Sequence, residues 1–113
     1  MTPEDIIREL VPKLVSEGDR YAVEVKDTGR TVQLWFNNQL GLSVAYEGER
    51  LYRDQDTVEL AAIRRDGKQF DVVYSKYHGW GDVRGWQSLD DALIAAKALR
   101  ASRADEFRRE MIS

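Results

Sequence analysis

The spacing of the apolar residues changes twice along this chain, and each change marks a change of secondary structure. Apolar side chains recur at helical spacing over residues 6–15, alternate with a period of two over residues 21–74, and return to helical spacing over residues 89–99. Strands grouped between two helices predict an α+β fold, because doubly wound folds alternate the two element types. We expect a short N-terminal helix, an antiparallel sheet of about five strands, or six with a short strand around Val83, and a long C-terminal helix packed on the sheet. The 113 residues fit a single domain, 1–113.

Capping motifs predict where both helices begin. Thr2 and Pro3 supply a hydroxyl cap followed by proline at the first helical position, and Ser88 with Asp91 forms a capping box. Pro12 stands inside the first helix, where it removes a backbone hydrogen bond and clashes with the preceding turn, at about 3 kcal/mol. We therefore expect a kink there, or two short helices.

Asp66-Gly67 is the strongest hairpin signal in the chain, because both residues tolerate the positive φ of a two-residue turn. Arg64, Arg65 and Lys68 cluster around this turn. Basic side chains that flank an acid such as Asp66 are typical of a solvated, ion-paired surface.

Composition excludes several kinds of site. The chain has no cysteine, which excludes disulfides and thiolate chemistry and fits a reducing, cytoplasmic compartment. Its net charge is −3, whereas nucleic-acid-binding proteins are usually strongly basic. No apolar run approaches the roughly 20 residues that span a bilayer, and the acidic first residues do not resemble a signal peptide. We expect a cytoplasmic protein without a membrane segment.

The residues that could carry catalysis are few. His78 is the only histidine, and with Asp82 it could form the base and orienting acid of a hydrolase, with Ser75 or Ser88 as nucleophile. Serine and aspartate are common, however, and Ser88 already caps a helix. One histidine and no cysteine argue against zinc, and Arg84 stands where a phosphate-binding glycine motif needs its third glycine. We expect no catalytic residue, no metal and no cofactor.

Aromatic residues concentrate in the glycine-rich segment that follows the last expected strand, next to basic side chains. Aromatic residues and arginine are enriched in interface hot spots, and aromatic rings also stack on bases. Trp86 and Tyr74 are expected in the core, whereas Trp80, with glycine on both sides, is the best candidate for an exposed functional aromatic. Trp35 lies on the polar face of its strand, so it is either an interface anchor or covered by the N-terminal helix. The candidate binding residues are Trp80, His78, Arg84, Tyr77, Trp35 and Lys76.

These observations favour a non-enzymatic binding protein that recognises another protein through a surface patch, as inhibitors and accessory factors of phage or mobile-element type do. Homodimerisation through the sheet or the last helix is a further expectation. The alternative is a small-ligand or nucleotide-binding module in which Trp80 or Trp35 stacks on a ring. Arg84, Arg64 or Lys76 would then meet phosphate, and nucleic acid ranks below both. A hydrolase built on the only histidine ranks third.

Overall fold

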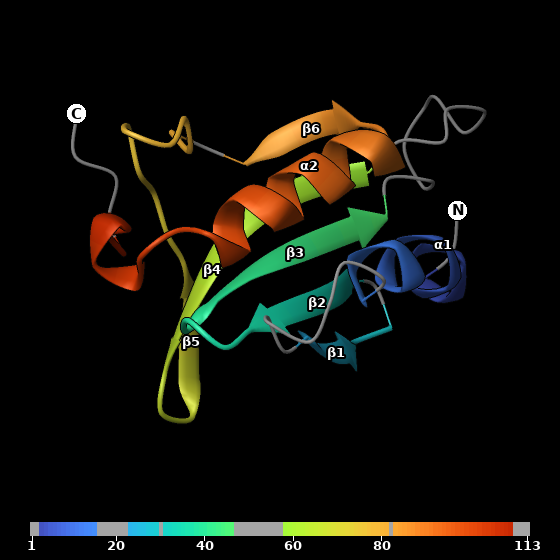
Figure 1. Cartoon of the computed structure of the whole chain (residues 1–113), viewed down its shortest axis with the longest axis horizontal. Helices are drawn as coiled ribbons and strands as arrows, with labels where there is room; N and C mark the ends of the chain where they lie inside the picture. Colours follow the sequence, from blue (N-terminus) through green and yellow to red (C-terminus); the bar gives the residue numbers. More distant parts are fainter. Residues whose placement is uncertain (1–2, 16–22, 30, 47–57, 82, 110–113) are drawn as a thin grey trace.

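Two helices lie against one face of an antiparallel sheet in the computed structural model, which describes residues 3–15, 23–29, 31–46, 58–81 and 83–109 (Figure 1). The predicted α+β fold is confirmed for this part of the chain. Its elements are α1 (Pro3–Val15), β1 (Val23–Asp27), β2 (Thr31–Phe36), β3 (Leu40–Tyr46), β4 (Val58–Asp66), β5 (Gln69–Val72), β6 (Arg84–Gln87), α2 (Leu89–Arg100) and the short 3-10 helix η1 (Ala104–Glu106).

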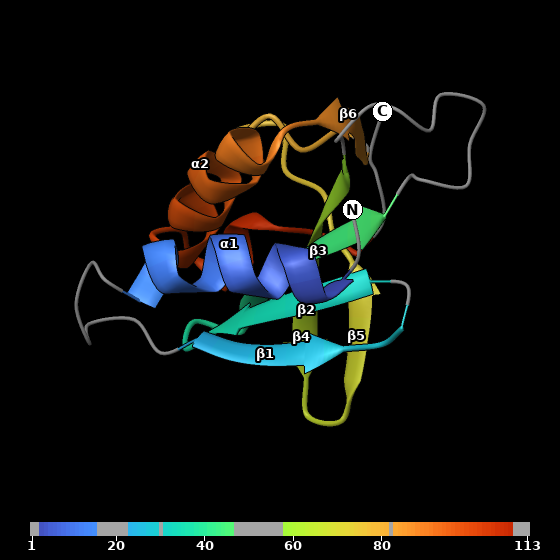
Figure 2. The same cartoon turned by 90° about the vertical axis from the view of Figure 1, so that its right-hand side faces the viewer.

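The first five strands stand side by side in chain order, so each hairpin joins neighbours. β4 is nine residues long, and its free edge is shared by two strands. β5 pairs with its last residues and β6 with its first. β6 is the sixth strand expected near Val83. The sheet is strongly twisted, and the β4–β5 hairpin extends beyond the other strands (Figure 2).

Alternation along the strands gives the sheet an apolar face, and both helices cover it (Figure 2). The alanines on the buried side of α2 leave little volume between the helix and the sheet, so the two backbones approach closely. Among the described residues, the core includes Leu10, Leu14, Val32, Leu34, Phe36, Leu40, Leu42, Val44, Val58, Leu60, Ala62, Ala92, Ala95, Ala96 and Leu99. We call the opposite side of the sheet the outer face.

The helix ends agree with the predicted motifs where they are described. Ser88 Oγ accepts a hydrogen bond from Asp91 N (3.1 Å), and the Asp91 carboxylate accepts one from Ser88 N (2.9 Å). The hydrogen bonds that the Asp91 carboxylate accepts from the backbone N–H and from the hydroxyl of Ser88 lower the pKa of Asp91. α1 is one helix that includes Pro12, so the expectation of two short helices is wrong. Thr2 lies outside the described residues, and among those residues there is no helix whose length and apolar content would let it cross a bilayer.

The turn between β2 and β3 holds the end of α2 through one side chain. Asn38 Nδ2 donates to the carbonyl oxygens of Leu99 (2.9 Å), Arg100 (3.3 Å) and Ser102 (2.8 Å). Its Oδ1 accepts from Leu40 N (3.1 Å), which keeps the amide in place. The last carbonyls of a helix have no partner within the helix. Asn38 supplies one and thereby joins the helical layer to the sheet.

We expect Asn38→Ala to lower the free energy of unfolding by about 1–3 kcal/mol, because the carbonyls of Arg100 and Ser102 would lose the donor that Asn38 supplies. Urea unfolding followed by circular dichroism measures this. Asn37→Ala, one residue earlier and exposed, is the matched control and should change stability by no more than about 0.5 kcal/mol. Equal losses in the two variants would contradict this role for Asn38.

Candidate functional site

The predicted aromatic segment forms a tight loop closed by backbone hydrogen bonds. Ser75 N donates to Trp80 O (2.9 Å) and Trp80 N to Ser75 O (2.8 Å). Gly79 turns the chain with a φ of +75°, a value that favours glycine. Tyr77 is 85% exposed in this loop, and the neighbouring Lys76 is also exposed. The loop thus presents Tyr77 to the solvent.

The expectation that Trp80 is exposed is wrong. Only 2% of Trp80 is accessible, and its indole belongs to the hydrophobic core. The Arg84 guanidinium lies over this ring at 3.7 Å from its centroid and donates to Gly79 O (3.0 Å). Partial burial lowers the pKa of Arg84. Gly79 allows the chain to turn, and the contacts that Arg84 makes with the Trp80 ring and with Gly79 O stabilise the loop.

His78 has a different carboxylate neighbour from the one predicted. Its Nε2 lies 3.3 Å from Glu106 Oε1, and its ring stacks on Phe107 with 5.2 Å between centroids. Asp82, the predicted partner, lies outside the described residues. Ser75 Oγ accepts a hydrogen bond from His78 N (3.3 Å), so this hydroxyl supports the loop. Within the described chain, no three His, Asp or Glu side chains are grouped so that they could hold a metal ion.

Trp35 is buried too, with 4% exposed, but the N-terminal helix does not cover it. It lies on the outer face, opposite Gly41 of β3. A Cβ at Gly41 would stand only 2.7 Å from Trp35 Cε3, so the indole occupies the space that a side chain would need. The Phe70 ring meets it edge-on at 5.7 Å, and the Arg65 guanidinium lies over it at 5.0 Å. Side chains of the sheet itself therefore bury Trp35.

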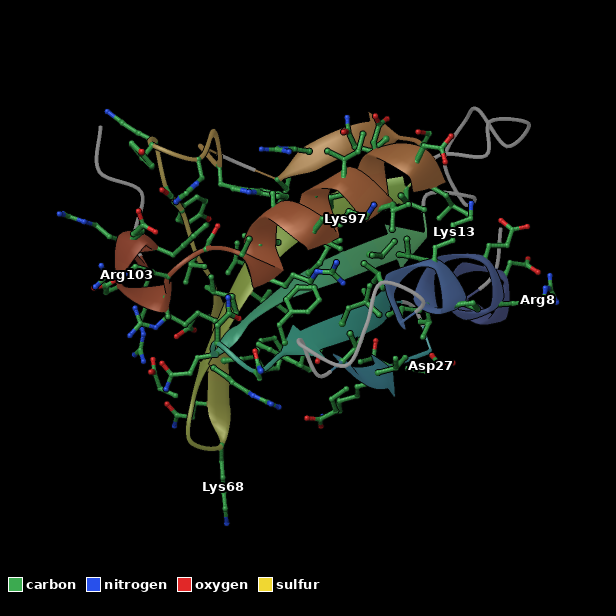
Figure 3. All side chains as sticks on the ribbon, in the orientation of Figure 1. Arg8, Lys13, Asp27, Lys68, Lys97 and Arg103 are labelled. Carbon is green, nitrogen blue, oxygen red and sulfur yellow. The ribbon has the colours of Figure 1, made fainter. Side chains whose placement is uncertain are left out.

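An open cleft of about 120 Å³ lies beside Trp35, between the outer face and the β4–β5 hairpin. We call it the hairpin cleft; it is lined by Glu24, Lys26, Gln33, Trp35, Arg65, Gly67, Lys68, Gln69 and Phe70. Phe70 is 46% exposed, so an aromatic edge faces the solvent here. Lys68 stands at the tip of the hairpin and points away from the body of the protein (Figure 3). The lining combines aromatic rings with three cations and one acid.

The local fold explains why these side chains meet. The two-residue turn is Gly67-Lys68, one residue later than predicted, and Gly67 takes a φ of +65°. Trp35 Nε1 donates to Gln33 Oε1 (3.2 Å), which fixes the indole. Arg65 Nη1 lies 2.8 Å from Glu24 Oε2, across the two strands between them. Both side chains are partly exposed, at 37% and 61%, so the pair contributes about 0–1 kcal/mol.

Sequence reasoning identified Trp35 and the basic hairpin but did not connect them. Lys76, Tyr77, His78, Trp80 and Arg84 meet in or beside one loop, whereas Trp35 belongs to the hairpin cleft. The other cleft residues are Glu24 and Lys26 at alternate positions of β1, Gln33 of β2, Arg65 of β4 and the consecutive residues 67–70 of the hairpin. The alternation along β1 and β2 was visible in the sequence, but the twist that brings β1 towards the hairpin was not.

The C-terminal segment is fastened to this hairpin by charged side chains. Arg64 Nη1 donates to the carbonyl oxygens of Ala104 (2.9 Å) and Phe107 (3.2 Å). Asp66 pairs with Arg109, and Arg64 Nη2 lies 3.7 Å from the same carboxylate. The hydrogen bond from Arg109 lowers the pKa of Asp66, although burial acts in the opposite direction. Arg64 therefore binds the backbone of the C-terminal segment. Contact with a phosphate was one of the roles predicted for this side chain.

Comparison of the chain with protein-family models, curated proteins and solved structures finds no match.

We expect Gly41→Ala to destabilise the protein by about 1–3 kcal/mol, because the new methyl group would overlap Leu34 O and Trp35 Cε3, each 2.7 Å from it. Gly81→Ala is the matched control, since no atom lies within 4 Å of a Cβ at that position. Thermal and urea unfolding of both variants would measure the difference. A Gly41→Ala protein as stable as the Gly81→Ala protein would contradict the close approach.

The pKa of Asp66 gives a pH-dependent prediction. A carboxyl whose pKa is lower in the folded state stabilises the fold above its ordinary pKa of 3.8, and this stabilisation is lost as the pH falls through the folded value. We expect Asp66→Asn to reduce the free energy of unfolding at neutral pH and to have less effect in strong acid. Urea unfolding at both pH values tests this. In an Arg109→Gln background the same substitution should lose most of its effect; a loss that is independent of both pH and Arg109 would refute the assignment.

Proposed function

We propose that this chain is a non-enzymatic binding protein that recognises another protein through the hairpin cleft and the outer face beside it. The observation that carries the proposal is a half-exposed Phe70 next to the buried Trp35 and a partly exposed Arg65. Aromatic and arginine side chains in such a setting supply most of the affinity of protein interfaces. The candidate surface therefore lies on the outer face, where Trp35 supports the residues that would meet a partner.

Apolar exposure on β5 extends this surface. Val72 is 37% exposed and lies two residues from Phe70, so both side chains point to the same face of the strand. Exposed apolar residues that adjoin polar and charged neighbours are typical of interaction sites.

The dimensions of the cleft weigh against the alternative of a small-ligand module. Pockets for small molecules usually enclose about 300–1,000 Å³, whereas the hairpin cleft encloses about 120 Å³. The rings proposed to stack on a nucleotide are also covered, Trp80 by Arg84 and Trp35 by Arg65 and Phe70. A protein partner needs neither a deep pocket nor a free indole.

The finer features of this function are part of the same proposal. A role as an inhibitor or accessory factor, of the kind found in phages and mobile elements, fits the small size of the domain. A cytoplasmic location fits a sequence without cysteine. Homodimerisation would use the same outer face, or the last helix α2 on the other side of the sheet.

Phe70→Asp should abolish partner binding without unfolding the protein, because it places a charge in the centre of the proposed surface. Proteins captured from an extract of the producing organism would be quantified for the wild type, Phe70→Asp and Ile94→Asp. The last variant is the control, since Ile94 lies on α2, on the opposite side of the sheet. Circular dichroism would check that each variant is folded. Identical capture by all three proteins would show that this surface is not the binding site.

A further inference from the structure

We infer that the hairpin cleft binds an acidic segment of the partner protein, and that a carboxylate of this segment replaces Glu24 on Arg65. The inference rests on the proposed function and adds the chemistry of the partner. The cleft reverses the charge of the molecule: the chain carries a net −3, but Lys26, Arg65 and Lys68 face a single acid in the cleft. This local excess of cations complements an anion.

The Arg65 guanidinium is prepared for a carboxylate. The guanidinium lies over the Trp35 ring, 5.0 Å from its centroid, and Arg65 N donates to Gln39 O (3.0 Å), which holds its backbone. Arginine presents several N–H donors in a planar fork that suits both oxygens of a carboxylate. Within the described part of the chain, this guanidinium donates to one oxygen only, Glu24 Oε2. A carboxylate that took the place of Glu24 could accept hydrogen bonds from Arg65 with both of its oxygens.

Glu24 can be displaced at little cost in free energy. Its side chain is 61% exposed, and exposed pairs of this kind contribute about 0–1 kcal/mol. The other two cations, Lys26 and Lys68, have no ion pair with any carboxylate among residues 3–15, 23–29, 31–46, 58–81 and 83–109. An incoming acidic segment would gain their attraction as well as that of Arg65.

The size of the cleft favours the side chain of a peptide over a nucleotide as its ligand. The cleft offers about 120 Å³ and is open to the solvent, whereas pockets that hold small molecules usually enclose about 300–1,000 Å³. It is therefore too shallow to enclose a nucleotide, but it would accommodate one side chain of a peptide. Phe70 borders the cleft and is 46% exposed, so an apolar residue next to the acid would find a contact. The preferred ligand is therefore an acidic residue beside an apolar one.

Peptide titrations followed by NMR would test the inference directly. The probes are Gly-Ser-Glu-Leu-Glu-Ser-Gly and the same peptide with Gln, or with Lys, in place of Glu. The reporter is the indole N–H signal of Trp35, which bonds to Gln33 inside the cleft. We expect the Glu peptide to shift this signal at millimolar concentration and the other two to leave it unchanged. No shift with the Glu peptide, or an equal shift with the Gln peptide, would overturn the inference.

Substitutions in the cleft should move the affinity in opposite directions. Glu24→Gln should strengthen binding of the Glu peptide by up to about fivefold, because the internal competitor loses its charge. Arg65→Gln should weaken it about tenfold. Lys68→Gln, at the hairpin tip where the fold does not depend on the side chain, should weaken it by a smaller factor. Arg103→Gln removes the same charge from a site far from the cleft and should have no effect (Figure 3).

Two further outcomes separate this inference from the proposed function. A shift of the Trp35 signal by a thymidine decanucleotide, without one by the Glu peptide, would assign the cations to nucleic-acid phosphate and overturn the inference. A partner captured through Phe70 but bound equally by the Arg65→Gln protein would also overturn it, while the proposed function would stand. Loss of the proposed function itself would appear as capture that is independent of Phe70.

Discussion

The missing side chain at Gly41 is the constraint on which the outer face depends. A Cβ there would stand 2.7 Å from both Leu34 O and Trp35 Cε3, so any other residue would force β2 and β3 apart or expel the indole. With glycine in place, Trp35 covers the middle of the sheet and Ile63 is only 1% exposed. Arg65 then has a flat apolar surface to lie on. The absence of a side chain at Gly41 thereby allows a second cluster of buried side chains to form on the outer face. The same cluster holds the Arg65 guanidinium over Trp35.

Two adjacent arginines in β4 show how strand geometry divides a charge cluster. Arg64 and Arg65 point to opposite faces, because side chains alternate along a strand. Arg64 donates to the carbonyls of Ala104 and Phe107 and fixes the C-terminal segment. Arg65 lies on Trp35 and remains partly exposed. Structural support and the proposed partner contact therefore belong to neighbouring residues on opposite faces, so substitutions can test the two roles separately.

The order of elements could be predicted because it follows from local patterns. The apolar period identified helices and strands, and Ser88 with Asp91 fixed the start of α2. The candidate site depended on contacts between distant residues and was predicted less well. Trp80 was expected to be exposed because glycines flank it, yet Gly79 serves a turn and the indole enters the core. Trp35 over Gly41 depends on the register of β2 and β3, which the sequence does not state.

The charge of the whole molecule limits how the hairpin cleft could recognise an acidic segment. A protein with a net −3 repels an acidic partner at long range, and physiological salt screens fields beyond about 8 Å. In the proposed complex, the cleft cations would therefore act only after contact, when the partner is already close to Phe70. Until then Glu24 neutralises Arg65, which lowers the attraction for unrelated anions. Recognition would then require an apolar contact and a carboxylate together, because neither a weakly paired cation nor a single exposed ring retains a partner alone.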